Sequence, residues 1–348
     1  MTTWRAAVIG CGRPNAVSND GKQGFGIAYL HGQGYVSSTL TTLCAVADIA
    51  MDNAQAYANH FGVERVYADY REMLHAERPD LVSICTWPRL HKEMVLAAAE
   101  AGVKGILCEK PMTVHYKDAL EMHEICRKKG IVLHVNHQRR YDFPFIKARE
   151  LADAGEIGRL LRLEAWVGDG WDLMSWGVHW IDMMRFYTHD ANVRNVFAQA
   201  DVSKRTIRYE HPVEDRILMQ LKFDNEVQGI LHLSEDEVQP GNLLVGEEGM
   251  ILFYPEIRSP ITVVGRSGTR KLEWPDDAKS GFQGSVEHLA LSVQTGLPSD
   301  LDSGSALINM QIAMAAFQSA RTHRTIDLPF EDPVNPLVAW FGMDAAAK

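Results

Sequence analysis

Short runs of consecutive apolar residues alternate with helix-like segments through the first third of the chain. Runs that are apolar at successive positions are typical of strands buried on both faces. These runs are residues 6–9, 42–47, 81–85, 105–108 and 131–135. The segments between them with helical periodicity include residues 52–61, 89–101 and 116–129. Strands that alternate with helices predict right-handed crossovers and an α/β, doubly wound parallel sheet.

After about residue 145 the pattern changes from continuous apolar runs to strict alternation. Residues 217–223 and 227–233 alternate apolar and polar side chains around a turn at Asp224, which predicts an antiparallel hairpin. Other strand-like stretches are residues 159–167, 250–254 and 261–264, and helix-like stretches are residues 145–154, 285–295 and 305–322. We therefore expect an α/β domain with a doubly wound parallel sheet over residues 1–136. An α+β domain with an open, mostly antiparallel sheet is expected over residues 137–348.

Composition narrows the possible functions. The 348 residues are 46% hydrophobic and 23% charged, which is ordinary for a folded protein, and the net charge of -10 disfavours a nucleic-acid partner. We find no apolar run near the roughly 18 residues that a membrane span needs. The five cysteines are an odd number without C-x-x-C spacing. They predict reduced core thiols in a cytoplasmic protein, with neither disulfides nor a metal site.

A glycine pair, Gly10 and Gly12, follows the first predicted strand. In the pattern G-x-G-x-x-G these two glycines allow a tight turn and a close approach of the backbone to a pyrophosphate. Asn15 stands where the third glycine belongs. The simplest interpretation is an insertion over residues 13–23, with Gly24 or Gly26 in the third role. The alternative is an ordinary glycine turn after a strand.

Asp48 ends the second predicted strand. A carboxylate at that place accepts hydrogen bonds from the adenosine ribose hydroxyls and repels a 2'-phosphate. Residues 49–51 supply no arginine that would hold such a phosphate. The pattern therefore favours NAD over NADP, and the alternative role of Asp48 is a helix cap.

Two further strand ends carry candidate catalytic or binding side chains, because ligands bind outside the carboxyl ends of parallel strands. Lys110 follows the fifth strand, where a desolvated lysine can take the proton of a substrate hydroxyl as hydride leaves the same carbon. The alternative for Lys110 is a solvated charge, and for His91 a structural or capping role. The expected cofactor contacts are Gly10, Gly12, Arg13, Asp48, Thr86, Trp87, Pro88, His91, Glu109 and Lys110.

In the second part of the chain, His179 and Asp182 fall on one face of a predicted helix. His179 can relay a proton near neutral pH while Asp182 orients it or binds a hydroxyl, unless the histidine is simply a core residue. Three tryptophans either stack on a sugar ring or pack in the core: Trp166, Trp171 and Trp176. Three arginines either bind an anionic group of the substrate or form salt bridges: Arg139, Arg140 and Arg162.

Four motifs occur together in a characteristic order. They are Gly10-Cys11-Gly12, Glu109-Lys110-Pro111-Met112, Gln138-Arg139-Arg140-Tyr141 and Gly177-Val178-His179-Trp180-Ile181-Asp182. With these motifs the chain resembles the glucose–fructose oxidoreductase and inositol dehydrogenase family, Gfo/Idh/MocA. The resemblance implies that Lys110 is catalytic or binds the reacting hydroxyl, and that His179 is its proton-transfer partner. It also implies that residues 1–136 form an NAD-binding Rossmann domain and that the chain forms a homodimer or homotetramer through the open sheet of residues 137–348.

One position departs from the inositol dehydrogenase-like members of that family. They carry an aspartate four residues before the histidine, and this chain has Ser175 there. Asp169, Asp172 or Asp182 are candidates for the missing carboxylate, which argues against a plain inositol dehydrogenase. The expected catalytic residues are Lys110, His179 and Asp182, and the expected substrate contacts are Lys110, Arg139, Trp166, Asp172, Trp176 and His179.

Three hypotheses follow. The main one is an NAD-dependent oxidoreductase that transfers a hydride between nicotinamide and a secondary alcohol of a sugar, cyclitol or glycoside. The second is a glycosidase or lyase that retains its NAD, oxidises C3 transiently and eliminates the aglycone. The third is a non-catalytic dinucleotide sensor that regulates a protein partner.

Overall fold

The computed structural model describes residues 3–13, 26–168, 170–235 and 239–343. The chain forms two compact units, which are described separately below. Unit 1 comprises Met1–Thr113, Asp118–Gln138 and Lys279–Ala306, and unit 2 comprises Val114–Lys117, Arg139–Ala278 and Leu307–Lys348.

Unit 1 contains a six-stranded sheet in the order β3-β2-β1-β4-β5-β6, with every pair of neighbours parallel. This order is that of a dinucleotide-binding Rossmann fold, so the predicted doubly wound sheet is confirmed. The strands are β1 (Trp4–Ile9), β2 (Thr41–Ala47), β3 (Arg65–Tyr67), β4 (Leu81–Ile84), β5 (Gly105–Cys108) and β6 (Val132–Val135). Strands β4 and β5 are buried along their whole length, as their continuous apolar runs predicted.

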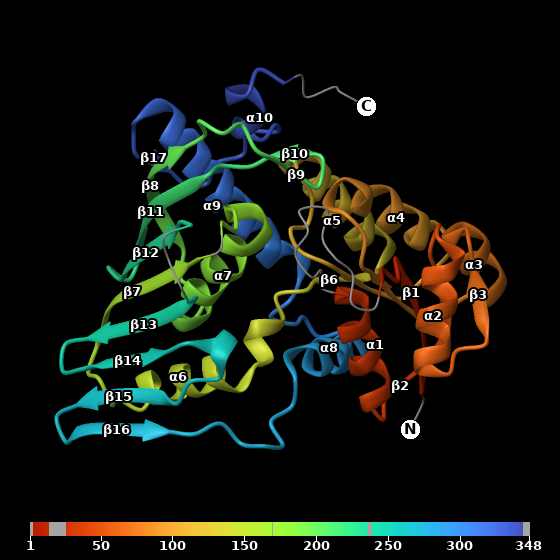
Figure 1. Cartoon of the computed structure of the whole chain (residues 1–348), viewed down its shortest axis with the longest axis horizontal. Helices are drawn as coiled ribbons and strands as arrows, with labels where there is room; N and C mark the ends of the chain where they lie inside the picture. The colour runs from red at the N-terminus through yellow and green to blue at the C-terminus, as the bar shows by residue number, and fades with distance from the viewer. Residues whose placement is uncertain (1–2, 14–25, 169, 236–238, 344–348) are drawn as a thin grey trace. The chain divides into compact units, whose positions relative to one another are not determined.

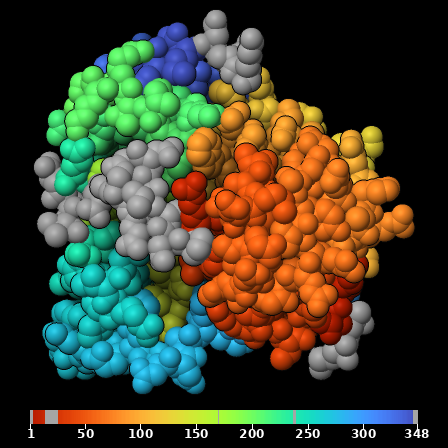
Figure 2. All heavy atoms as spheres, turned by 45° about the vertical axis from the view of Figure 1, so that its right-hand side comes forward, coloured from red at the N-terminus to blue at the C-terminus, as the bar shows by residue number. Residues whose placement is uncertain are grey.

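Six helices accompany this sheet. They are α1 (Ile27–Ser37), α2 (Met51–Phe61), α3 (Tyr70–Glu77), α4 (Pro88–Glu100), α5 (Tyr116–Lys129) and α8 (Gly281–Thr295). Helix α8 belongs to unit 1 although it comes late in the chain, within the range expected for the second domain. A Cβ on Gly105 of β5 would lie 2.7 Å from Val293 of α8, so the glycine permits this close packing. Figure 2 shows the segments from β1 to α4, red to orange, as one closely packed body.

Unit 2 contains a nine-stranded sheet in the order β16-β15-β14-β13-β7-β12-β11-β8-β17. Its paired strands are antiparallel except β7 and β12, so the predicted open, mostly antiparallel sheet is confirmed. The strands are β7 (Leu160–Val167), β8 (Val193–Asp201), β11 (Arg216–Phe223), β12 (Gln228–Leu233), β13 (Gly241–Gly246), β14 (Met250–Phe253), β15 (Ile261–Gly265), β16 (Gly268–Leu272) and β17 (Ile326–Asp327). A separate pair is β9 (Ile207–Arg208) and β10 (His211–Pro212).

Helices pack on the buried face of this sheet (Figure 1). The ring of Phe145 on α6 lies 5.3 Å from that of Phe253 on β14, and Ser319 on α9 accepts a hydrogen bond from Ala198 N–H on β8. The elements are η1 (Gln138–Tyr141), α6 (Phe143–Asp153), η2 (Leu173–Gly177), α7 (Val178–Tyr187), η3 (Pro255–Ile257), α9 (Ser303–Thr322) and α10 (Pro336–Trp340).

Two further observations concern the predictions from composition. Within the described residues no helix combines the length and the apolar character that crossing a membrane requires. All five cysteines are free thiols, and burial raises the pKa of Cys126 to about 12. They are therefore protonated at neutral pH and act as small apolar side chains.

Candidate active site

The glycine turn after β1 has the backbone geometry of a phosphate loop. Gly10 and Gly12 have φ angles of +85° and +63°, which side chains with a Cβ rarely adopt. A Cβ on Gly10 would lie 2.6 Å from Thr86 Cγ2, so this glycine also permits the close approach of the β4–α4 turn. A Cβ on Gly12 would meet none of the described atoms within 4 Å. Among the described residues, none therefore fills the space beside Gly12, where contact with a dinucleotide is expected.

Asp48 holds this turn from the end of β2. Its Oδ2 accepts hydrogen bonds from the backbone N–H groups of Cys11, at 2.9 Å, and Gly12, at 3.1 Å. Its Oδ1 accepts from Ala50 N–H, but Ala50 is itself the N-cap residue of α2 and no side chain caps that helix, so the alternative role of Asp48 as a helix cap is wrong. Burial and the charge of Asp48 raise the pKa of the Cys11 thiol. The carboxylate thus stands beside the glycine turn, where the ribose contact was predicted.

The β4–α4 turn carries the next predicted cofactor contacts. Trp87 is exposed and precedes α4, which begins at Pro88. His91 is fully buried, with Nε2 3.0 Å from Thr86 O and Nδ1 3.1 Å from Pro111 O. Burial lowers the pKa of His91, which keeps the ring neutral. The ring of His91 thus connects the β4–α4 turn to the backbone at Pro111, which indicates a structural role for His91.

Glu109 belongs to a buried polar network that was not predicted from the sequence. Its Oε1 is 2.7 Å from His31 Nε2 and accepts a hydrogen bond from Asn136 Nδ2, while His31 Nδ1 lies 2.9 Å from Ser83 Oγ. Burial alone would raise the pKa of Glu109, but the hydrogen bond with His31 and the charge of Lys110 lower it. No sequence signal distinguished His31 from other histidines on the apolar side of a helix.

Lys110 lies two residues after the end of β5 and is half-buried. Its backbone N–H donates to Glu109 Oε2 at 3.2 Å, so the network reaches the residue predicted to be the base. The structure thus brings the glycine turn, Thr86 and Lys110 to the carboxyl ends of neighbouring parallel strands, where ligands bind in such sheets.

Some predictions fall partly or wholly outside the described residues. The insertion was predicted over residues 13–23, and of these the structure describes Arg13, which is exposed. Asn15 and Gly24, as well as Asp169, lie outside the described residues. Gly26 directly precedes α1, so its backbone stands where the third glycine of the motif was expected.

In unit 2 the turn η2 leads directly into α7 and carries the predicted substrate residues. Asp172 is buried, and its Oδ1 accepts from Ser175 N–H at 2.7 Å. The rings of Trp171 and Trp176 lie 5.4 Å apart, and that of Trp176 lies 6.4 Å from His179. The structure therefore places Trp176 beside His179, and Trp171 beside Trp176.

Trp166 lies elsewhere. Alternate residues of a strand point to opposite faces, and Ala165 and Val167 of β7 face the buried side where Met184 of α7 packs. Trp166 therefore lies on the other face, against Gly241 and 5.9 Å from the ring of Tyr254. Of the two tryptophans expected to contact the substrate, Trp166 and Trp176, the strand therefore keeps Trp166 away from α7.

Arg139 is buried against aromatic rings. Its guanidinium lies 4.8 Å from the ring centre of Trp180 and 5.3 Å from that of Trp176. It also donates to Glu256 at 2.6 Å. These contacts place Arg139 behind Trp176, where it supports the indole, and Arg162 similarly pairs with Glu164.

Asp182 is held in a buried ion pair. Arg140 Nε donates to its Oδ2 at 2.8 Å, and Arg140 Nη2 and Asn309 Nδ2 both donate to its Oδ1 at 2.9 Å. Burial opposes the charge of Arg140, but the carboxylates of Asp182 and Asp190 raise its pKa above the usual value. This geometry ties α7 to η1 and α9 and favours a structural role for Asp182.

A second buried carboxyl group, Glu214, was not among the predicted residues. Its Oε1 accepts from Leu173 N–H at 2.6 Å, one turn before Trp176. In the sequence Glu214 precedes an alternating strand and resembles a solvated charge at a strand end. Its burial depends on contacts between distant segments, so no local pattern could have shown it.

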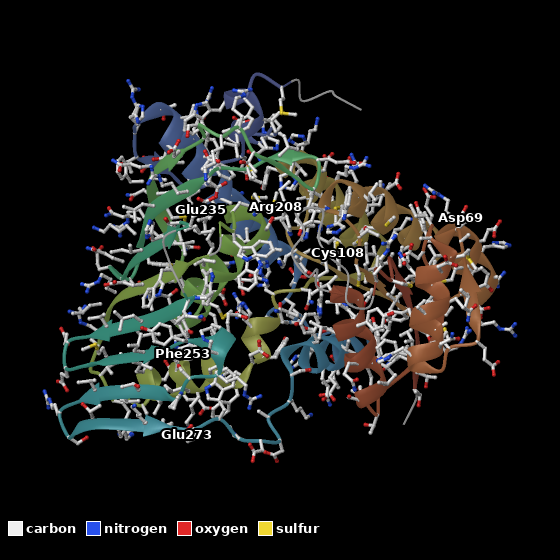
Figure 3. The ribbon with its side chains drawn as sticks, viewed as in Figure 1. Asp69, Cys108, Arg208, Glu235, Phe253 and Glu273 are labelled. Atoms are coloured by element: carbon white, nitrogen blue, oxygen red, sulfur yellow. The ribbon has the colours of Figure 1, made fainter. Side chains whose placement is uncertain are left out.

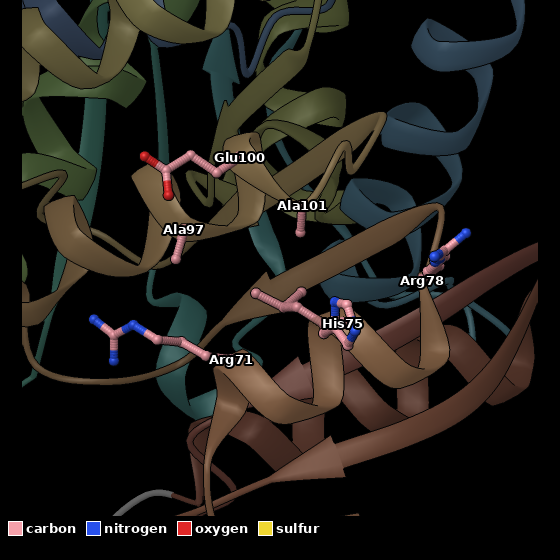
Figure 4. A pocket seen from close by; sticks show the side chains of 7 residues that line it. Arg71, His75, Arg78, Ala97, Glu100 and Ala101 are labelled. Carbon is pink, nitrogen blue, oxygen red and sulfur yellow. The ribbon is translucent and has the colours of Figure 1, made fainter.

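A surface hollow in unit 1 holds none of the predicted residues. It lies between α3 and α4 and is lined by Arg71, Leu74, His75, Arg78, Ala97, Glu100 and Ala101 (Figure 4). Because the carboxyl ends of the strands carry the predicted cofactor residues, we do not assign the dinucleotide to this hollow.

The chain is similar to known dehydrogenases over most of its length. The chain is 24% identical over 347 residues to scyllo-inositol 2-dehydrogenase (NAD(+)) of Bacillus subtilis, covering 93% of this chain and 96% of that one. It is 26% identical over 337 residues to D-glucoside 3-dehydrogenase of Escherichia coli, covering 86% and 93%. A solved oxidoreductase from Agrobacterium radiobacter, in complex with NAD+, L-tartaric acid and magnesium, has a TM-score of 0.77 at 21% identity, covering 94% and 98%.

Two family models match different parts of the chain. The model of an oxidoreductase family with an NAD-binding Rossmann fold matches residues 4–137, and the model of the GFO/IDH/MocA C-terminal domain matches residues 172–252. Together they span more than half of the chain and confirm the predicted fold, the NAD cofactor and the oxidoreductase class. The chain therefore belongs to the GFO/IDH/MocA family of NAD-dependent oxidoreductases.

Proposed function

We propose that this enzyme is a dehydrogenase that oxidises a secondary alcohol of a monosaccharide, cyclitol or glycoside. The observation that carries the proposal is Lys110 at the carboxyl end of β5, in the same sheet edge as the glycine turn and Asp48. Relatives named as inositol and glucoside dehydrogenases support the substrate class. Bound NAD would supply the acceptor for the hydride of the alcohol carbon.

The chain's own residues then handle the proton. Lys110 binds the reacting hydroxyl and takes its proton, and the Glu109 network holds the backbone at Lys110 in place. His179 assists the proton transfer, and the indole of Trp176 packs on the apolar face of the sugar. Asp182 keeps α7 in position through Arg140.

The test is a steady-state assay at 340 nm with NAD and a panel of cyclitols, aldoses and glycosides. We expect turnover on at least one secondary alcohol of this panel and none on primary alcohols of similar size. Cofactor binding without turnover on any substrate, together with a stable protein partner in pull-down, would instead favour the dinucleotide sensor.

A second candidate is favoured by Ser175, which stands where inositol dehydrogenase-like members have an aspartate. In this alternative the glycoside is oxidised at C3, which acidifies the C2–H. Loss of that proton expels the aglycone from C1, water adds to the resulting double bond, and the hydride returns to C3. Aglycone release at catalytic NAD without net absorbance change at 340 nm would identify it.

We further propose that copies of the chain associate through the open face of the unit 2 sheet, as a dimer or tetramer in the cytoplasm. Leu218 on β11 and Met250 on β14 expose about two-fifths of their area on this sheet. Light scattering should show an oligomer that Leu218→Lys weakens. A monomeric wild-type enzyme would remove the proposal.

A further inference from the structure

Two buried carboxyl groups meet at the start of the turn η2. Asp172 is 1% exposed and Glu214 is 3% exposed. Asp172 accepts from Ser175 N–H through Oδ1 and from Arg208 Nη1, at 2.6 Å, through Oδ2. Glu214 Oε1 accepts from Leu173 N–H. Figure 3 labels Arg208, which reaches this turn from β9.

The charges in this cluster do not balance if both carboxyl groups are ionised. Arg208 forms an ion pair with Asp172 and offsets one negative charge. His211 of β10 also faces Asp172, but burial lowers the pKa of His211, so its ring is neutral at pH 7. The charges that act on Glu214 are therefore those of Asp172 and Arg208, and a second carboxylate would be uncompensated.

The surroundings of the second carboxyl oxygen of Glu214, Oε2, also indicate that this group is protonated. Among the described residues, no hydrogen-bond partner for the buried Oε2 is found. An ionised carboxylate in such a place would lose its hydration without replacement, which is costlier than burying a neutral acid. Burial and the charge of Asp172 raise the pKa of Glu214 to about 8.

This cluster supports the residues that face the predicted substrate. Arg208 stacks over the ring of Trp171 at 5.1 Å, and Trp171 packs against Trp176, which neighbours His179. The backbone that Glu214 and Asp172 hold, from Leu173 to Ser175, leads directly to that tryptophan. A change in charge at Glu214 is therefore transmitted to the indole through one turn of chain.

We propose that Glu214 is a positioning residue which, as a neutral acid, fixes the η2 turn and thereby Trp176 and His179. Loss of its proton places two negative charges side by side and loosens the turn. The sugar subsite would then be formed at neutral pH and weakened under alkaline conditions. The consequence for turnover rests on the proposed function, whereas the effect on the turn does not.

The first test needs no substrate. Near-ultraviolet circular dichroism and tryptophan fluorescence of the full chain are measured from pH 6 to pH 10. We expect a transition near pH 8 that is absent from Glu214→Gln and weakened in Trp171→Phe. Glu226→Gln, which changes an exposed carboxylate at a hairpin, should keep the transition. A transition of the same midpoint and size in Glu214→Gln would overturn the proposal.

Asp172→Asn provides a second variant in case the glutamine variant does not fold. It removes the negative charge that faces Glu214 and leaves Arg208 to pair with Glu214 instead. We therefore expect the spectroscopic midpoint to move to lower pH by at least one unit. A midpoint that stays near pH 8 would show that the pair of carboxyl groups does not control the turn.

The second test uses turnover. A group that titrates near pH 8 is protonated in roughly one molecule in ten at pH 9, so the apparent KM of wild type should rise about tenfold between pH 7 and pH 9. In Glu214→Gln this rise should disappear, while the dependence of kcat on Lys110 persists. An enzyme without activity on any sugar leaves the spectroscopic result intact and disproves the proposed function alone. A KM rise unchanged in Glu214→Gln disproves the inference.

Discussion

In unit 1 the predicted cofactor residues stand at the ends of neighbouring parallel strands, whereas in unit 2 the predicted substrate residues are held by side-chain ion pairs. Gly10 and Gly12 need no side chain, and Asp48 accepts hydrogen bonds from the backbone amides of Cys11 and Gly12. His179 and Trp176 instead depend on Arg140, Arg208 and the carboxylates that pair with them. Backbone geometry therefore fixes the positions of the predicted cofactor residues, whereas buried ion pairs fix the positions of the predicted substrate residues.

The largest expected effect concerns the ion pair of unit 2. Arg140→Met leaves the buried carboxylate of Asp182 without its bidentate partner, and we expect a loss of roughly 3–5 kcal/mol in the free energy of unfolding. Urea unfolding of both proteins measures it. Arg159→Met breaks an exposed pair with Glu247 and should cost less than about 1 kcal/mol. Equal losses in the free energy of unfolding of the two variants would show that burial does not strengthen the contribution of this ion pair.

The next effect concerns the backbone of unit 1. Gly10→Ala introduces a Cβ that meets Thr86 in a residue with positive φ, and we expect a loss of about 1–3 kcal/mol with weaker NADH binding. Gly62→Ala is the matched control, because φ is +71° there and none of the described atoms lies within 4 Å of the new Cβ. If the control loses as much NADH affinity, the close approach at Gly10 is not responsible.

A smaller effect is expected at Asp48. Asp48→Asn removes the negative charge that would face a 2'-phosphate and should improve NADPH binding relative to NADH by about tenfold. Fluorescence titration of both cofactors measures the ratio. The idea that Asp48 selects NAD fails if the wild-type enzyme already binds NADPH as tightly as NADH.

The smallest effect separates the two faces of the unit 2 sheet. Trp176→Leu should raise KM for the sugar about three- to tenfold, because stacking of an aromatic ring contributes about 0.5–1.5 kcal/mol. Trp166→Leu should leave KM unchanged, since Trp166 packs against Gly241 on the opposite face. A KM increase in the Trp166 variant alone would reverse this assignment.

Much of the fold could be predicted from local patterns. The strand at residues 105–108 and the helix at residues 116–129 match the structure, because apolar periodicity reports burial directly. Helix α8 was expected in the second domain, yet it packs on β5 through Leu289 and Val293. Periodicity identifies an amphipathic helix but does not state which sheet it covers.

The site could be predicted where topology decides the position of a residue. The carboxyl ends of parallel strands meet at one edge, so Gly10 and Lys110 could be assigned to it. Trp166 was grouped with Trp176 because they are close in sequence, but strand alternation separates them. Glu214 and His31 were missed, since burial of a polar side chain by distant segments leaves no local signal.

The central claim is the proposal that Lys110 takes the proton of the substrate hydroxyl and that His179 assists its transfer. The direct measurement is kcat/KM for Lys110→Ala, His179→Ala and the double variant, with NADH affinity and Lys128→Ala as controls. We predict losses of about 10²–10⁴-fold in each single variant, little further loss in the double variant, and unchanged NADH binding in His179→Ala. Near wild-type turnover in Lys110→Ala, or losses that multiply in the double variant, would contradict it.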